Sequence, residues 1–478
     1  MDTHGAGDNV YTRGIADFVS GLRYEDIPAE VIARIKLLIL DSLGCALYAT
    51  DLPWSRILME TLAETDTSIA CTVLGTNRRL SAPHAALMNG TLVQGFELDD
   101  VHRVGVLHVG AVTLPALLAV VEMRANSARG GMSGRDFLAA AVAGYEIGPR
   151  VGMCMGQEHI GQGWHSGATV GVFSAASGAA RALGLSPEQT VHALGIAGTQ
   201  AAGLMAAQFG AMVKRMHAGR SSQSGLYGAL LAERGFTGIV DVFENEYGGF
   251  CTTFSRSTDR FNRAELTAGL GSTWETMRIA LKFYSCVGSN HTTLDAIRKM
   301  QVLRPFTEPE VAKILVFGSQ VTMDHVGWRY EPQGLTSAQL NLPYCVATLL
   351  LESDVFVEQF SEALVDDAER IRVSRKVAVQ EDLAITARGK AYRHMVRVQV
   401  TLTDGTVMEE TVEAPRGSEH SFASAEDVIA KFYKLAGAKA GPIVEAVMGA
   451  EGLADAAELV RLLARPTVSP LPSTTAPA

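Results

Sequence analysis

Several histidines and lysines of this chain stand beside glycines in short strings. Histidine transfers protons near neutral pH without large tuning, lysine neutralises carboxylates, and glycine lets backbone and ligand approach closely. The residues that share this setting are His108 in VLHVG, His165 in GWHSG, Lys214 and His217 in MVKRMHAG, and Lys282 and His291 in LKFYSCVGSNH. Because the chain has a formal net charge of -10, this gathering of cations indicates a site for a small polyanion such as a di- or tricarboxylate.

These residue types fit chemistry at a carbon beside a carboxylate. Removing a proton, a hydroxide or carbon dioxide there creates negative charge that spreads onto the carboxylate oxygens, so fixed cations must lie near them. The two lysines can supply this charge, and His108, His165 and His291 can give or take a proton at carbon. Decarboxylation, dehydration and epimerisation share a carbanion-like intermediate, so the residues alone leave all three open.

Acidic residues precede the first of these histidines in the string ELDDVHRVGVLH, which begins at Glu97. This string, together with LLILDSLGCALYA, GWHSGATVG, MVKRMHAG, ENEYGGF and NLPY, occurs in the order and approximate spacing of the MmgE/PrpD family. The chain resembles this family along most of its length. The family includes 2-methylcitrate dehydratase, cis-aconitate decarboxylase and iminodisuccinate epimerase. The resemblance implies a homodimeric lyase that uses no cofactor.

The resemblance also implies roles for individual residues. Many members have aspartate where this chain has Glu97, and a threonine where it has Val101. The strings ELDD, GWH, MVKR and HVGW are more similar to fungal cis-aconitate decarboxylases than to 2-methylcitrate dehydratases. We therefore expect conversion of cis-aconitate to itaconate, with 2-methylcitrate dehydration or epimerisation of an amino-dicarboxylate as alternatives. The predicted catalytic residues are His108, Glu97, Lys214, His165 and Tyr344, and the predicted substrate-binding residues are His291, Lys282, Asp99, Asp100 and His217. In this hypothesis Glu97 orients His108, which protonates carbon with help from Tyr344.

Structural roles compete with several of these assignments. Asp99 and Asp100 could be the N-terminal residues of a helix, where the dipole favours carboxylates. His217 could bind backbone carbonyls at a helix end, and Tyr344 could be ordinary core packing. His102 and Arg103 are expected to face solvent and are left out of the site.

Metal and cofactor motifs are sparse in this sequence. Asp99 and His102 have the spacing of a carboxylate-histidine ligand pair on a helix, but no second pair and no HExxH accompany them. The six cysteines are scattered without a CxxC pair, and no GxGxxG follows a clear strand. We expect no metal and no cofactor. A metal-dependent hydrolase and an inactive carboxylate-binding protein are kept as alternatives from other classes.

The patterns around these residues predict a mainly α fold with an inserted α/β domain. The 478 residues are many for a single core, and 47% of them are hydrophobic. Helical spacing dominates to about residue 269, and a period of two appears from about residue 312 in AKILVFGSQVTM. The prediction is a helical domain (1–273 and 416–464), a smaller α/β domain (274–415) and a disordered tail (465–478). The resemblance implies that the α/β domain is a lid.

Three local patterns make this prediction specific. Small residues at 140–148 and 174–184 would let helices pack closely. Asp404-Gly405 after an alternating run predicts a β-hairpin, and Ser424 is suited to cap a helix with Asp427 at its positive end.

The remaining composition bears on location and partners. The polar N-terminus lacks the order of a secretion signal, and no apolar run is long enough to span a bilayer. With no cysteine framework, these features predict a cytoplasmic protein without membrane contacts. The acidic balance argues against a nucleic-acid partner.

Overall fold

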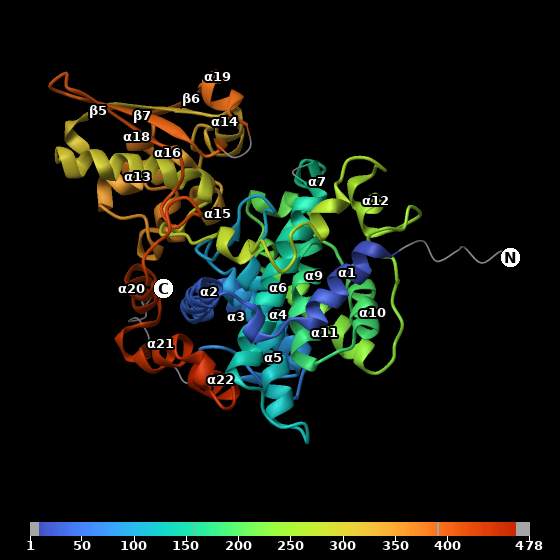
Figure 1. Cartoon of the computed structure of the whole chain (residues 1–478). Coiled ribbons are helices and arrows are strands. Elements are labelled where there is room, and N and C mark those ends of the chain that lie inside the picture. Colours follow the sequence, from blue (N-terminus) through green and yellow to red (C-terminus); the bar gives the residue numbers. More distant parts are fainter. Residues whose placement is uncertain (1–8, 157, 390–391, 465–478) are drawn as a thin grey trace.

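The computed structural model describes residues 9–156, 158–389 and 392–464. Helices make up most of these residues, and one four-stranded sheet lies at the far end of the molecule from α5 and α22 (Figure 1). The predicted mainly α fold with a small sheet region is therefore confirmed. The tail predicted at 465–478 lies outside the described residues. No helix in the described part of the chain has both the length and the apolar character needed to cross a membrane.

The larger part of the molecule is a helical body built around α5. Residues 109–122 of this helix are all buried, as expected for a helix that is apolar on every side. The N-terminal helices of the body are α1 (Val10–Gly21), α2 (Ala29–Tyr48), α3 (Pro53–Thr65), α4 (Ala82–Val93), α5 (Val109–Ala125), α6 (Gly134–Met155), α7 (Glu158–Gly161), α8 (Ser166–Thr169), α9 (Gly171–Leu183), α10 (Pro187–Gly198), α11 (Val213–Glu233) and α12 (Phe250–Ser255).

Small residues allow α6 and α9 to pack closely, as predicted. A Cβ at Gly144 would lie 2.8 Å from the carbonyl oxygen of Ser174, and one at Gly148 would lie 2.6 Å from the Ser174 hydroxyl. Any larger residue at either position would push the two helices apart.

The end of the chain returns to the helical body through α20 (Ala425–Ala436), α21 (Gly441–Met448) and α22 (Ala457–Leu463). Figure 1 shows α20 and α21 beside α2, and α22 beside α5. Phe432 belongs to the same hydrophobic core as Leu38 of α2. The predicted cap is confirmed, because the Ser424 hydroxyl accepts a hydrogen bond from the Asp427 amide at 3.1 Å.

The predicted domain boundary at Trp274 is too early. Trp274 and Leu281 are part of the core of the helical body. Between them, β4 (Ile279–Ala280) pairs with β3 (Val101–His102) in the segment that carries the acidic string. Residues 274–281 therefore belong with the body, because their apolar side chains are buried there.

The sheet of the α/β domain has the strand order β6-β5-β7-β8. β5 is parallel to β6 and antiparallel to β7, and β7 and β8 form the predicted hairpin around Asp404-Gly405. The run AKILVFGSQVTM is only partly strand, because β5 ends at Gly318 and α14 follows. The elements are α13 (Gly288–Leu303), β5 (Val311–Gly318), α14 (Gln320–Val326), α15 (Leu335–Leu340), α16 (Leu342–Glu352), α17 (Glu362–Val365), α18 (Ala368–Ser374), β6 (Val377–Glu381), α19 (Leu383–Ala387), β7 (Val396–Leu402) and β8 (Val407–Val412).

A second hydrophobic core fills the space between this sheet and the helices α13 and α16. The inward residues of β7, such as Val398 and Val400, belong to this core.

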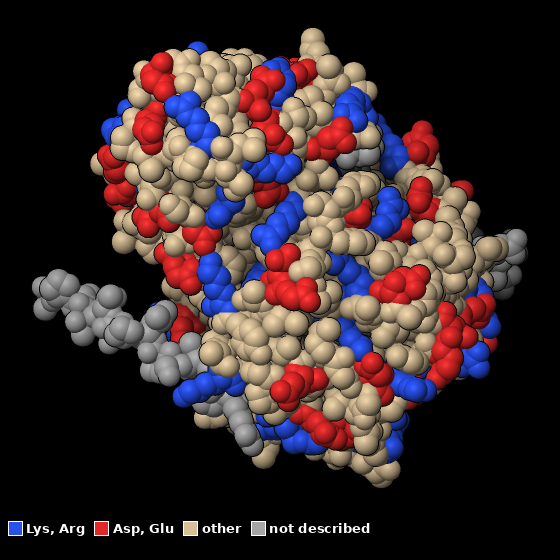
Figure 2. Space-filling view, turned by 60° about the vertical axis from the view of Figure 1, so that its left-hand side comes forward, with Lys and Arg blue, Asp and Glu red and all other residues tan. Residues whose placement is uncertain are grey.

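On the face shown in Figure 2, basic and acidic side chains are interspersed over both parts of the molecule.

Candidate active site

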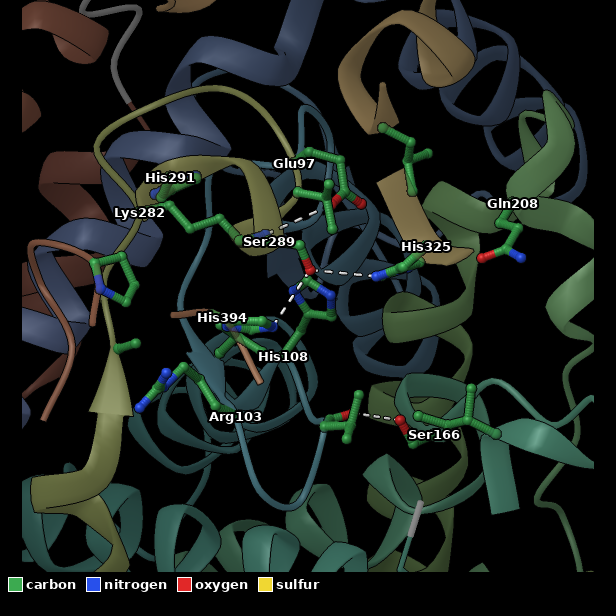
Figure 3. Close-up of a pocket in the computed structure, with 18 of the residues that line it drawn as sticks. Glu97, Arg103, His108, Ser166, Gln208, Lys282, Ser289, His291, His325 and His394 are labelled. Atoms are coloured by element: carbon green, nitrogen blue, oxygen red, sulfur yellow. Dashed lines mark hydrogen bonds and ion pairs between the residues drawn. The ribbon is translucent and has the colours of Figure 1, made fainter. Parts of the chain in front are cut away.

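A cavity of about 160 Å³ lies where the helical body meets the α/β domain. Both parts of the molecule contribute to its walls, and Figure 3 shows most of the side chains involved. The polar and charged lining residues are Glu97, Arg103, His108, His165, Ser166, Gln208, Lys214, Lys282, Ser289, His291, His325, Arg393 and His394. The structure thus brings together most of the residues that the sequence singled out, although they come from four separate segments.

Three helices begin at this cavity. His108 is the residue before α5, Lys214 is the second residue of α11, and Ser289 and His291 lie in the first turn of α13. Backbone amides and the positive end of the dipole at a helix start both favour anions. The fold therefore adds to the attraction that the lysines exert on a carboxylate.

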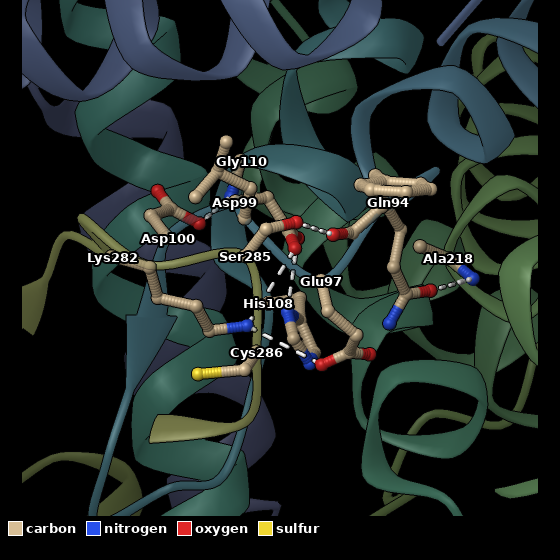
Figure 4. A network of polar contacts seen from close by, with 12 residues as sticks. Gln94, Glu97, Asp99, Asp100, His108, Gly110, Ala218, Lys282, Ser285 and Cys286 are labelled. Carbon is tan, nitrogen blue, oxygen red and sulfur yellow. Dashed lines mark hydrogen bonds and ion pairs between the residues drawn. The ribbon is translucent and has the colours of Figure 1, made fainter. Parts of the chain in front are cut away.

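Glu97 is the centre of an ionic cluster on one side of the cavity. Its Oε1 atom accepts hydrogen bonds from Lys214 and, at 3.1 Å, from Arg215, while Oε2 lies 3.5 Å from Lys282 Nζ (Figure 4). Burial alone would raise the pKa of Glu97, but the surrounding cations outweigh it and hold the pKa well below its usual value. Three cations thus face this carboxylate, so the cluster retains positive charge for a ligand.

The two lysines respond differently to this environment. Burial lowers the pKa of Lys214, because Glu97 offsets only part of the desolvation. Burial also acts against the charged form of Lys282, but Glu97 and Asp99 outweigh it and raise the pKa. Lys282 therefore remains a firm positive charge in the cavity at neutral pH.

Asp99, and not Glu97, orients His108. Its Oδ2 atom lies 2.9 Å from His108 Nδ1, and the carboxylate is fully buried behind the imidazole (Figure 4). Burial would raise the pKa of Asp99, but His108 and Lys282 lower it, so the group is ionised and accepts the Nδ1 proton. The expectation that Glu97 positions this histidine was wrong, because the Glu97 side chain is engaged by the cations.

Backbone geometry explains why Glu97 binds the cations while Asp99 binds His108. Glu97 has φ of 57°, a left-handed conformation that costs a residue with a Cβ atom about 1–2 kcal/mol. The turn separates the directions of two carboxylates that are only two positions apart.

His165 and His217 form a pair. Their Nδ1 atoms are 3.2 Å apart, so one ring donates and the other accepts. Burial lowers the pKa of both, and Lys214 adds to the effect, which keeps the pair neutral. His165 lines the cavity, whereas His217 lies behind it and sets the orientation of His165. His217 was predicted to bind substrate directly, and its position does not support that role.

Two further predicted site residues lie outside the cavity walls. Tyr344 is fully buried in the α/β core, packs against the tilted ring of Tyr330, and donates its hydroxyl to the Leu364 carbonyl at 2.8 Å. Asp100 accepts a hydrogen bond from the Gly110 amide at 2.9 Å beneath the start of α5. Neither side chain lines the cavity, so the geometry does not support the roles predicted for them.

The residues expected to face solvent are in fact buried. His102 has no exposed surface, and its Nε2 atom lies 2.9 Å from Glu275. Arg103 lines the cavity and binds Glu419. The polar residue types at these two positions suggested exposure. Both positions are nevertheless buried by the surrounding chain, which the local sequence does not indicate.

Several residues that line the cavity were not predicted as site residues from the sequence. His325, Arg393 and His394 come from α14 and from the loop before β7, and Ser289 lies between the two histidines. His325 was noted only as part of a string resembling the family. The pair Arg393-His394, one residue before an alternating strand, was the available hint.

The last helices of the chain also reach this region. Lys431 of α20 is buried, and its Nζ atom donates to the Leu98 carbonyl at 2.8 Å and to Asp41 at 2.5 Å. Leu98 lies between Glu97 and Asp99, so this lysine fixes the backbone that carries both carboxylates.

The described residues contain no group of three His, Cys, Asp or Glu side chains arranged to hold a metal ion.

Comparison with known proteins adds to this geometry. Residues 13–262 match the MmgE/PrpD N-terminal domain, and residues 284–446 match the MmgE/PrpD C-terminal domain. The chain belongs to the MmgE/PrpD family. The expected family is therefore confirmed, and its two domains cover most of the chain.

Members of the MmgE/PrpD family with similar sequences include named enzymes. The cis-aconitate decarboxylase-like protein oryM of Aspergillus oryzae is 36% identical over 95% of this chain and 97% of its own length. Cis-aconitate decarboxylase of Aspergillus terreus is 34% identical over 96% of this chain and 97% of its own length. A mitochondrial 2-methylcitrate dehydratase of Yarrowia lipolytica is more distant, at 21% identity over 83% of this chain and 77% of its own length. These relatives are lyases, in agreement with the expected enzyme class.

Proposed function

We propose that this protein is a lyase that decarboxylates cis-aconitate to itaconate and carbon dioxide. The observation that carries the proposal is the pairing of His108 with Asp99 in a cavity that also holds Lys214 and Lys282. The Nδ1 atom of His108 is bound to Asp99, which leaves Nε2 for proton transfer. The similarity to fungal cis-aconitate decarboxylases selects the substrate among the carboxylates that such a site could accept.

The reaction needs charge stabilisation and one proton. The bond between the methylene carbon and its carboxylate breaks, and its electron pair forms a new double bond to the central carbon. The pair of the old double bond moves to the far carbon and is delocalised onto that carbon's carboxylate. Lys214 and Lys282 stabilise this charge, and protonated His108 delivers a proton from Nε2 to the far carbon. His165, held by His217, and His291 contact the carboxylates that remain.

The α/β domain acts as a lid in this proposal. It contributes His291 and His325 to the cavity, while His108 and Lys214 come from the helical body. Closure of the two parts over a bound carboxylate would exclude water and strengthen the electrostatic contacts.

A proton NMR time course of chelator-treated protein with cis-aconitate, run beside 2-methylcitrate, tests the proposal. Itaconate should form from cis-aconitate without added metal. If cis-aconitate stays unchanged while 2-methylcitrate loses water, the protein is a dehydratase instead. Inactivity towards both would reject these two substrates and direct the assay to amino-dicarboxylates.

A further inference from the structure

Arg393 differs from the other cations that line the cavity. The two lysines face Glu97, and Arg103 is bound by Glu419 through Nε at 3.1 Å and Nη2 at 2.5 Å. Arg393 forms no ion pair with a carboxylate anywhere in the described ranges, and its Nη2 atom donates to the Arg103 carbonyl at 2.7 Å. Its charge is therefore not matched by a contacting anion of the protein.

This guanidinium remains charged at neutral pH. Burial lowers the pKa of Arg393 to about 10, with repulsion from Arg103 adding to the effect and Glu419 opposing it. Two guanidiniums thus share one carboxylate on this side of the cavity. A largely enclosed cation without a contacting counter-charge is costly, and an anionic ligand would remove that cost.

Neutral hydrogen-bonding groups lie beside Arg393. The Ser289 hydroxyl is 3.3 Å from His325 Nδ1 and 3.3 Å from His394 Nε2. The hydroxyl has a single proton, so at least one of the two imidazoles must donate to it. The remaining ring nitrogen of His394, Nδ1, is buried and has no hydrogen-bond partner. The site therefore offers an unused polar atom next to an unmatched charge.

The ionic cluster around Glu97 and the arginines Arg103 and Arg393 lie on different sides of the cavity. In Figure 3, Glu97 and Arg103 are at opposite sides of the labelled residues, with His394 and His108 between them. The Glu97 cluster is next to His108, where proton transfer would occur. The arginine side is therefore suited to a carboxylate that takes no part in bond breaking.

We propose that Arg393, with His394 beside it, binds the central carboxylate of a propane-tricarboxylate skeleton and so selects tricarboxylates over dicarboxylates. The identity of this skeleton rests on the proposed function. A guanidinium bound to the departing carboxylate would stabilise the ground state and slow the release of carbon dioxide, whereas binding a retained carboxylate carries no such penalty. Arg393 is thus a specificity-determining residue for the site.

Calorimetric binding of two saturated ligands tests this inference. Propane-1,2,3-tricarboxylate carries the central carboxylate, and glutarate has the same chain without it. Arg393→Met should weaken binding of the tricarboxylate by about ten- to a hundredfold, the range expected for a lost charge-assisted contact, and change glutarate binding by less than about twofold. Equal losses for both ligands, or a loss for neither, would overturn the proposal.

Two further variants guard against effects on folding and net charge. Arg393→Lys keeps the charge without the planar fork, so its preference for the tricarboxylate should be intermediate. Arg397→Met removes an arginine of β7 that is bound to Glu409 of β8, away from the cavity, and should leave both affinities unchanged. If Arg397→Met reproduced the selective loss, net charge and not the cavity contact would be the cause. Neither ligand turns over, so a failure to form itaconate would reject the proposed reaction without affecting this result.

Discussion

The Asp99 carboxylate binds His108 at Nδ1, with 2.9 Å between the two atoms, and this fixes which nitrogen can reach a substrate. A neutral imidazole that donates from Nδ1 must accept at Nε2, and a protonated one can donate there. The carboxylate also stabilises the imidazolium that a proton donor to carbon requires. Glu97, two residues earlier, instead forms ion pairs with Lys214, Arg215 and Lys282.

Replacing Asp99 with Asn should lower kcat by about 10²- to 10⁴-fold, because the amide can no longer fix the tautomer or stabilise the imidazolium. KM should change less than kcat. Initial rates of itaconate formation measure both. Asp100→Asn, one position away and outside the cavity, is the matched control and should retain near-normal kcat. A variant of Asp99 with normal kcat would remove His108 from the proton-transfer role.

Glu97→Gln should destabilise the protein at pH 7 by about 3–5 kcal/mol, since buried cations lose their counter-charge. The pKa of Glu97 is depressed in the folded state, so its contribution is full above the unfolded value near 4.3 and is lost as the pH falls further. Urea unfolding from pH 8 to pH 3.5 should show a constant gap between wild type and variant that narrows below about pH 4. The exposed Glu362→Gln is the control, and a gap independent of pH would contradict the ionic role.

Asp100→Asn should change the pH dependence of stability in the opposite direction. Burial, together with the nearby Asp99 and Asp41 charges, raises the pKa of Asp100 to about 8 against the hydrogen bond from the Gly110 amide. A raised folded pKa means that stability is full below about pH 4 and is lost as the pH rises towards 8, by on the order of 5 kcal/mol. The Asn variant should lack this loss and be more stable than wild type at pH 8. If the free energies of unfolding of wild type and variant differed by a constant amount from pH 5 to pH 8, the buried, protonated carboxyl would be contradicted.

Tyr344→Phe should leave kcat within about threefold of wild type. Its hydroxyl binds the Leu364 carbonyl in the α/β core, so the change removes one hydrogen bond and about 1 kcal/mol of stability. Rate measurements and urea unfolding on the same preparation test both statements. A fall in kcat of a hundredfold or more would restore the role that the family resemblance implies.

Much of the fold followed from local signals. The Asp404-Gly405 hairpin and the Ser424 cap depend on neighbours in the chain, and both appear as expected. The boundary at Trp274 did not, because the side chains of 274–281 are apolar in either domain, and only tertiary packing decides which core receives them.

The site was predictable where residue type and surroundings agreed. His108, His165 and Lys214 combine a reactive side chain with nearby glycines, and all three line the cavity. The partner of His108 could not be read from the sequence, because the left-handed turn at Glu97 decides where each carboxylate points. Arg393 lies far along the chain, and nothing near it indicates that its charge would be unmatched.

The hydrogen bond from Lys431 to the Leu98 carbonyl joins positions 333 residues apart. When the ribosome has translated as far as α19, nearly all of the reactive side chains have already been made, yet the backbone between the two carboxylates still lacks its anchor. Competence for chemistry is therefore gained late in synthesis, once α20 has emerged and docked. A chain that stops before α20 lacks this anchor, so we expect it to be inactive.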